Sequence, residues 1–136
     1  MSDLLQIFGF TWMLVSALIG LYLGVKHLGV AERLEALANT GQLAEYHHLH
    51  TAFRWTVTVH AHGFLFSVVC VLVSVVLPRL ALAPMVVNAV GIGLMVSTVI
   101  WTSAALARFR PMMGLADVGF LVAIATTAIG LGRAFS

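Results

Sequence analysis

Charged residues are scarce in this chain. Of its 136 residues, seven are Lys or Arg and five are Asp or Glu, which together make 9% of the sequence. Soluble domains carry about 25% charged residues, so an ordinary water-soluble fold is excluded. Intrinsic disorder is excluded as well, because 61% of the residues are hydrophobic and the mean hydropathy is +1.05. The composition predicts an integral membrane protein, with the lipid bilayer as its first partner.

Two further scarcities narrow the class. The only cysteine is Cys70, so no disulfide forms within the chain. The net charge is only +2, which is too small for the basic surface of a nucleic-acid-binding protein. No nucleic-acid partner is expected.

The gaps between charged residues predict the membrane-spanning helices. Residues 4–25, 55–78 and 80–107 carry no charge, and each stretch exceeds the roughly 20 residues that cross the hydrocarbon layer as a helix. Pro84 suits the first turn of a helix, which places the third span at about 84–107. The last charge-free stretch, 118–132, is too short to span unless its helix begins earlier.

A fourth helix beginning near Met112 and including Asp117 would be long enough to span the membrane. We expect Asp117 to pair with Arg108 or Arg110. The sequence therefore predicts one all-α domain, residues 1–136, built as a four-helix transmembrane bundle. The predicted helices are about 4–25, 55–77, 84–107 and 112–132.

The basic residues outside these spans predict the orientation. Five of them fall in the predicted loops 26–54 and 108–111 or at their edges, against two at the other side of the membrane. Basic loops stay in the cytoplasm. We therefore expect loops 26–54 and 108–111 to be cytoplasmic and both termini to lie on the opposite side, in a plasma membrane of prokaryotic type.

Histidines are the unusual feature of the predicted second helix. Five of the six histidines lie within sixteen residues, and His60 and His62 fall inside the span. His60 follows Arg54 by six residues, or about 9 Å of helix rise. An ionisable residue at that depth marks a functional site by default, and neutral imidazole is a common metal ligand.

The spacing of His60 and His62 bears on what they bind. Residues two apart on a helix diverge by about 200°, so the two rings face opposite sides and cannot hold one small ion together. They could each ligate a separate haem iron, and Arg54 is the best candidate to pair with haem propionates. The alternative is that each imidazole only hydrogen-bonds a neighbouring helix.

The other histidines, His47, His48 and His50, lie in the predicted loop before the second helix. Imidazoles suit copper or zinc, so a copper or zinc site is one interpretation. A solvated, histidine-rich loop at the membrane surface is the alternative, and we favour it.

The stretch from His60 to Pro78 resembles the second helix of the styrene oxide isomerases. Those proteins are four-helix, trimeric membrane proteins that hold haem b between subunits through one axial histidine, and His60 lies at the matching position. His48 matches a second histidine of the family, and the Gly-x-x-Asp of residues 114–117 resembles the entry to its fourth helix. The resemblance covers most of the chain and implies a haem b homotrimer.

The substrate-handling residues of that family are not present. By the resemblance, an Asn, an Asp and a Tyr that hold and activate the epoxide would stand where this chain has Phe66, Ser97 and Ala105. An isomerase that uses ferric haem b as a Lewis acid is therefore the alternative function rather than the preferred one.

The His-x-His of residues 60–62 also resembles a helix of the catalytic subunit of the heme-copper oxidases. There, two histidines on opposite faces ligate two different haems, among twelve helices in a pseudo-threefold arrangement. A homotrimer of this chain would supply twelve helices. By that analogy each haem would lie at a subunit interface, with His60 from one subunit and His62 from the next.

The preferred interpretation is a haem b protein with a cytochrome-like redox or electron-transfer role. Bis-histidine ligation leaves no open site for a substrate, which suits electron transfer. If His60 alone ligates, the open position suits Lewis-acid chemistry, so whether the chain is an enzyme depends on His62. A quinone is one candidate redox partner, although no motif indicates it. A structural or metal-handling protein without haem is the third interpretation.

Overall fold

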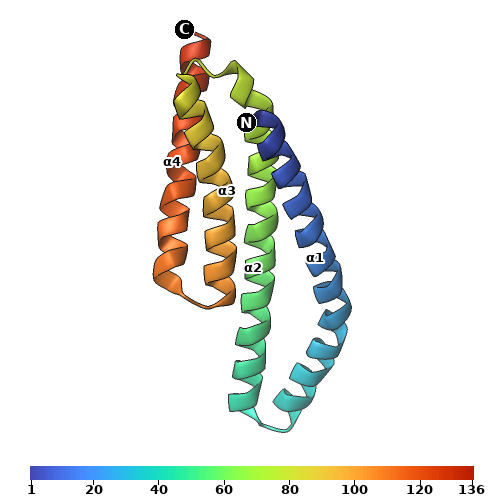
Figure 1. Ribbon diagram of the computed structural model, residues 1–136. Coiled ribbons are helices and arrows are strands. Elements are labelled where there is room, and N and C mark those ends of the chain that lie inside the picture. Colours follow the sequence, from blue (N-terminus) through green and yellow to red (C-terminus); the bar gives the residue numbers. More distant parts are fainter.

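The computed structural model describes all 136 residues and consists of four helices: α1 (Ser2–Asn39), α2 (Leu43–Val76), α3 (Pro84–Leu106) and α4 (Arg110–Ala134) (Figure 1). A short 3-10 turn, η1 (Leu77–Arg79), follows α2, and there are no strands. All four helices are long and apolar enough to cross a membrane. The prediction of an all-α fold with four helices long and apolar enough to span a membrane is confirmed.

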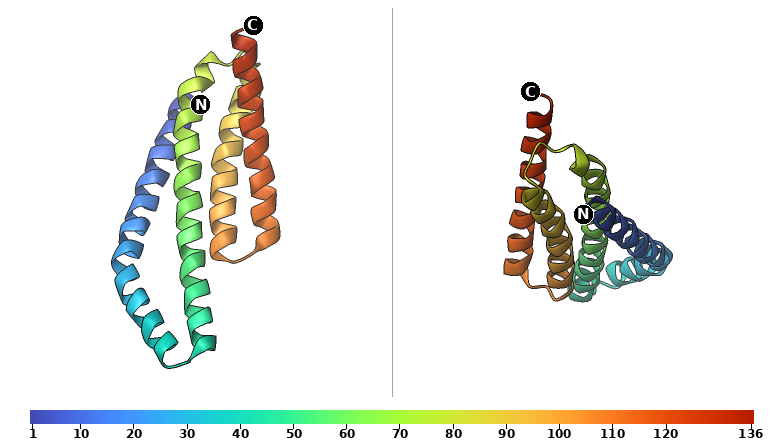
Figure 2. Two further views of the ribbon diagram at one scale, coloured as in Figure 1. Left: turned by 180° about the vertical axis from the view of Figure 1, so that it is seen from behind. Right: turned by 45° about the horizontal axis from the view of Figure 1, so that its top comes forward.

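The helices form two hairpins of unequal length. At a rise of 1.5 Å per residue, the 38 residues of α1 extend about 57 Å, whereas the 23 residues of α3 extend about 35 Å. The α1–α2 hairpin therefore projects well beyond the α3–α4 turn, while both termini lie at the opposite end (Figures 1 and 2). Since the hydrocarbon layer is about 30 Å thick, the projecting part lies outside it.

The projecting part corrects one sequence-based expectation. Residues 26–54 were expected to form a loop, but α1 continues to Asn39 and α2 begins at Leu43, so the turn is only three residues long. The residues concerned are rich in Ala, Leu and Glu, which have high helix propensity. The turn contains Gly41, whose φ of +70° suits glycine. His47, His48 and His50 are therefore helical residues.

Small residues bring α1 and α2 close together. A Cβ on Gly9 would stand 2.7 Å from Val71 Cγ2, and one on Gly63 would stand 3.3 Å from Ser16 Oγ. Glycine and serine at such positions allow helix backbones to approach closely in a membrane. These contacts fix the antiparallel register of α1 on α2, and the same register brings Gly20 opposite His60.

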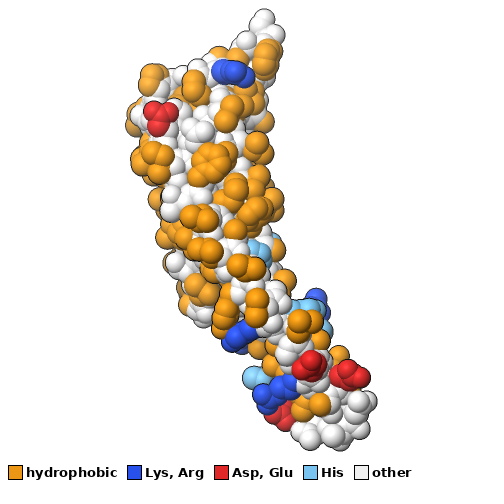
Figure 3. Space-filling view, turned by 90° about the vertical axis from the view of Figure 1, so that its right-hand side faces the viewer, with side chains coloured by type: hydrophobic (Ala, Val, Ile, Leu, Met, Phe, Trp, Pro, Cys, Tyr) orange, Lys and Arg blue, Asp and Glu red, His pale blue; other side chains and the backbone are white.

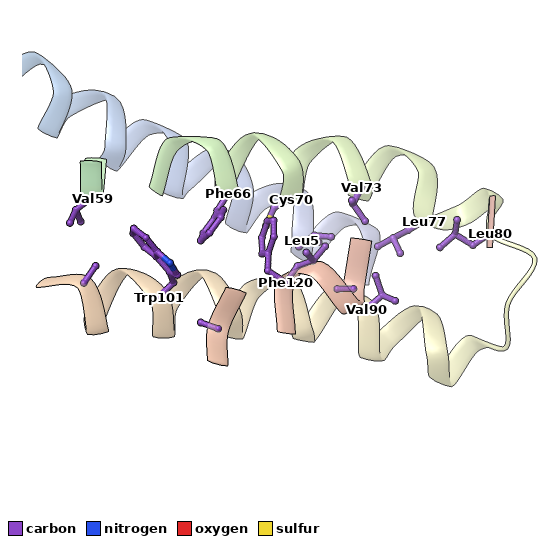
Figure 4. Close-up of a cluster of buried hydrophobic side chains, with 14 residues drawn as sticks. Leu5, Val59, Phe66, Cys70, Val73, Leu77, Leu80, Val90, Trp101 and Phe120 are labelled. Carbon is purple, nitrogen blue, oxygen red and sulfur yellow. The ribbon is translucent and has the colours of Figure 1, made fainter. Parts of the chain in front are cut away.

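The apolar core lies mainly between α2, α3 and α4, with Leu5 of α1 joining it (Figure 4). Phe66 of α2 contacts both helices of the second hairpin: its ring is 4.2 Å from that of Phe120 and 5.4 Å from that of Trp101, measured between centroids. Aromatic pairs at these separations contribute to packing beyond the area that they bury. The core therefore holds the second hairpin against α2 on the side away from most of α1.

The ion pairs correct the expectation that Asp117 pairs with Arg108 or Arg110. The single salt bridge joins Arg33 to Glu45 across the projecting hairpin, at 3.5 Å between two exposed side chains. Asp117 pairs with neither Arg108 nor Arg110. Asp117 lies two turns into α4, whereas Arg110 is the first residue of that helix and Arg108 precedes it, so sequence proximity did not bring these charges together.

Candidate functional site

A groove of about 700 Å³ runs between α1 and α2. Sites that bind small molecules and cofactors typically have about 300–1,000 Å³, so the groove is within the size range of cofactor sites. The groove follows α1 from Gly20 to Leu34, a rise of about 21 Å, and thus extends from the apolar part of the hairpin into its projecting part. Its polar wall is formed by Arg54 and Tyr46 together with three histidines: His27, His50 and His60.

His60 stands at the membrane end of this groove. Its ring lies against Gly20 of α1, where an added Cβ would be 2.6 Å from Cε1 and 2.7 Å from Nε2. Glycine is therefore required at position 20 for the imidazole to take this position. Nδ1 of His60 is buried and has no hydrogen-bond partner, and Nε2 also forms no hydrogen bond. A buried polar group without a partner is costly, so we expect a water molecule, an ion or a ligand to contact Nδ1.

Arg54 lies on the same groove, about 9 Å along α2 from His60 toward the projecting end. It pairs with no carboxylate of the chain. The groove thus offers an imidazole within the membrane and a guanidinium near the membrane surface, with apolar residues such as Leu23 and Val57 between them. This arrangement suits a flat apolar molecule that carries carboxylates at one edge.

The outer half of the groove contains His27, which the sequence did not single out, and His50, one of the three histidines considered above as copper or zinc ligands. His27 of α1 packs on Phe53, with ring centroids 5.7 Å apart, and His50 stacks on Tyr46 at 5.8 Å. His27 lies just beyond Val25, where the sequence predicted the end of the first helix. It follows Gly20 by seven residues, two helical turns, and so shares its face; only the continuation of the helix would have revealed it.

His62 faces the other side of α2, as the 200° divergence predicts. Its ring stacks on Trp101 of α3, with centroids 4.8 Å apart and planes inclined by 12°. Nδ1 of His62 lies 2.9 Å from the carbonyl oxygen of Thr58. A carbonyl only accepts hydrogen bonds, so Nδ1 carries the proton and the lone pair is on Nε2. Nε2 has no partner in the chain, and the ring is held in a form that can ligate.

The histidines near the start of α2 do not gather into a metal cluster. The structure places no three His, Cys, Asp or Glu side chains where they could hold one ion. His47 packs edge-on against Tyr46, on whose ring His50 also stacks, so these two histidines share one aromatic neighbour. Copper or zinc binding by His47, His48 and His50 stays a prediction, and no contact in the chain supports it.

The residues at the positions of the isomerases' substrate groups do not reach the groove. Phe66, Ser97 and Ala105 are all buried on the α2–α3–α4 side. Ser97 faces Gly119 of α4, and Ala105 accepts a hydrogen bond from Trp55. None of the three lines the site of His60.

Comparison of the chain with family models, curated proteins and solved structures finds no match. The chemistry of the site is therefore inferred from its own residues. They are one imidazole at membrane depth beside a glycine, one unpaired arginine at the surface of the same groove, and a second imidazole with a free Nε2 on the opposite face of α2.

Proposed function

We propose that this protein binds haem b in the membrane and serves a cytochrome-like role in electron transfer. The observation that carries the proposal is the placement of His60 and Arg54 on one groove, about 9 Å apart along α2. His60 would supply an axial imidazole, and Arg54 would pair with propionate carboxylates near the membrane surface. The residues present fit this group because the groove is of cofactor size and Gly20, which has no side chain, lets the His60 ring lie in the groove.

The proposal includes a homotrimer in which His62 of a neighbouring subunit supplies the second axial ligand. Its support is that His60 contacts α1 whereas His62 contacts α3, so one chain does not present both rings to the same iron. The outer face of α1 is covered with apolar side chains that lipid or another subunit must cover (Figure 3). Haem b with two histidine ligands supplies one-electron transfer and has no open coordination site.

Epoxide isomerisation remains the alternative, and the groove supports it less. Lewis-acid chemistry needs an open axial position, which the groove would offer if His60 were the only ligand. It also needs polar groups that hold the substrate, and Phe66, Ser97 and Ala105 lie in the core instead.

We place the projecting α1–α2 end in the cytoplasm because Lys26, Arg33 and Arg54 belong to it.

The test is an absorption and EPR spectrum of the full-length protein, purified from cells with an adequate haem supply. We expect a Soret band and a low-spin ferric signal in the wild type, and loss of the haem in His60→Ala. His47→Ala is the matched control, because this exposed histidine does not line the groove. A wild-type protein that carries no haem would refute both the electron-transfer and the isomerase functions.

A further inference from the structure

A second, smaller pocket lies where the α3–α4 turn meets α2. It has about 130 Å³ and is lined by Thr51, Trp55, Arg108 and Arg110. Nε1 of Trp55 donates a hydrogen bond to the carbonyl oxygen of Ala105, at 3.0 Å, and so ties α2 to the end of α3. Thr51 and Trp55 do not line the His60 groove, so the pocket is separate from it.

The pocket carries positive charge that nothing in the chain neutralises. Arg108 and Arg110 form no ion pair, since the single salt bridge of the chain is elsewhere. Arg110 is also the first residue of α4, whose N-cap residue, Phe109, makes no side-chain capping bond. The free N–H groups of a helix N-terminus carry partial positive charge, which adds to that of the two guanidinium groups. The pocket therefore favours an anion.

The backbone at this turn is unusual. Arg108 has a φ of +56°, in the left-handed region that glycine normally occupies at the end of a helix. At the other hairpin turn a glycine, Gly41, takes the corresponding conformation. The α3–α4 turn thus has an arginine at a position where glycine would be less strained.

The depth of the pocket indicates which anion it meets. From Pro84 to Leu106, α3 extends about 35 Å, slightly more than the hydrocarbon layer, so the turn after it lies at the level of the lipid headgroups. Tryptophans such as Trp55 are enriched at this level. The volume of 130 Å³ is too small for a whole cofactor, and it suits one small polar group.

We infer that this pocket binds the phosphodiester headgroup of an anionic phospholipid. Basic pockets between transmembrane helices bind anionic headgroups, and the planar guanidinium group pairs with two phosphate oxygens at once. The lipid would sit against Trp55 with its phosphate between Arg108 and Arg110. This site shares no residue with the groove, although Thr51 and Trp55 also line a space of about 200 Å³ with Arg54 and Thr58 of the groove.

The experiment is native mass spectrometry of the full chain in detergent, with phosphatidylglycerol and phosphatidylcholine offered at equal concentration. We expect the wild type to retain phosphatidylglycerol preferentially. The double variant Arg108→Gln/Arg110→Gln should lose roughly twenty- to thirtyfold in affinity for it, at about 1 kcal/mol per arginine. The control variant Arg79→Gln/Arg133→Gln removes two arginines at the opposite end and should keep the preference.

A single variant keeps the test decisive if the double variant does not fold. Arg108→Gly relieves the positive φ and should leave the protein at least as stable, yet it should weaken phosphatidylglycerol binding. Equal retention of the two lipids by the wild type, or unchanged retention by Arg108→Gly, would overturn the inference. Displacement of the lipid by millimolar inorganic phosphate would assign the pocket to free phosphate instead. Loss of haem from the double variant with its lipid preference intact would assign the arginines to the cofactor.

Discussion

The imidazole of His60 lies against the Cα of Gly20, so close that a methyl group at position 20 would stand 2.6 Å from Cε1 and 2.7 Å from Nε2. Gly20→Ala must therefore displace the ring. We expect it to abolish haem binding and to lower the free energy of unfolding by about 1–3 kcal/mol, as overpacking does. The Soret absorbance and the unfolding midpoint of the purified variant measure the two effects.

Gly24→Ala is the matched control for this substitution. Gly24 lies one turn further along α1 on the same groove, and a Cβ there would meet nothing within 4 Å. Alanine is favoured over glycine in a helix by up to about 1 kcal/mol, so this variant should be at least as stable as the wild type and should keep its haem. If Gly20→Ala were as stable as Gly24→Ala and kept its haem, the close contact between Gly20 and His60 would not be needed for haem binding.

The subunit-interface arrangement predicts complementation between two inactive chains. His60→Ala alone should lose haem, and His62→Ala alone should change the spectrum from low-spin to high-spin. When the two variants are co-expressed with different affinity tags and purified through both, some interfaces regain an intact His60 beside an intact His62. A low-spin signal should then return.

A low-spin signal that stays absent from doubly purified assemblies would contradict ligation across subunits. An unchanged spectrum in His62→Ala would reject His62 as a ligand and would favour the open-site chemistry of the isomerase alternative. Wild-type chains that carry the same pair of tags provide the control for the yield of mixed assemblies.

The close approach of α1 to α2 at Gly9 predicts a substitution that affects stability rather than the site. A Cβ on Gly9 would stand 2.7 Å from Val71 Cγ2 and 3.1 Å from the carbonyl oxygen of Ser67. Since the backbone cannot yield easily, we expect Gly9→Ala to cost about 1–3 kcal/mol in chemical unfolding. Gly29→Ala, where a Cβ meets nothing within 4 Å, should cost nothing. Equal stability of the two variants would contradict this register of the hairpin.

The hydrogen bond from Trp55 to the end of α3 predicts a smaller effect on the free energy of unfolding. Trp55→Phe removes the donor to the carbonyl oxygen of Ala105, which still accepts a hydrogen bond from the backbone N–H of Arg108. We expect a loss of about 0.5–1.5 kcal/mol in unfolding free energy. Trp12→Phe is the control, because Trp12 stacks on Phe8 without a hydrogen bond through its indole. A Trp55→Phe protein as stable as the Trp12→Phe control would show that the bond adds nothing.

The membrane-spanning part of the fold could be predicted from the sequence because hydrocarbon imposes a simple condition. Every backbone polar group must be paired within the membrane, so a long charge-free stretch has to be a helix. The same criterion says nothing about residues beyond the hydrocarbon. For this reason it located the spans and missed the helical continuation of α1 to Asn39 and of α2 back to Leu43.

The candidate site was predicted to the extent that it depends on helical geometry alone. The angle between His60 and His62 follows from 100° per residue, and the structure confirms their opposite faces. What each ring touches depends on how the helices pack. Neither the glycine beside His60 nor the stacking of Trp101 on His62 could be foreseen, and His27 entered the groove only because α1 does not stop at Val25.

All residues that line the groove fall between positions 20 and 60, within the first hairpin. Chains emerge from the ribosome with the N-terminus first, and helical hairpins with local contacts form quickly. The His60 groove can therefore close before α3 and α4 have been synthesised, whereas the ring of His62 receives its support from Trp101 only after α3 has been inserted. We therefore expect the two faces of α2 to form one after the other during biosynthesis.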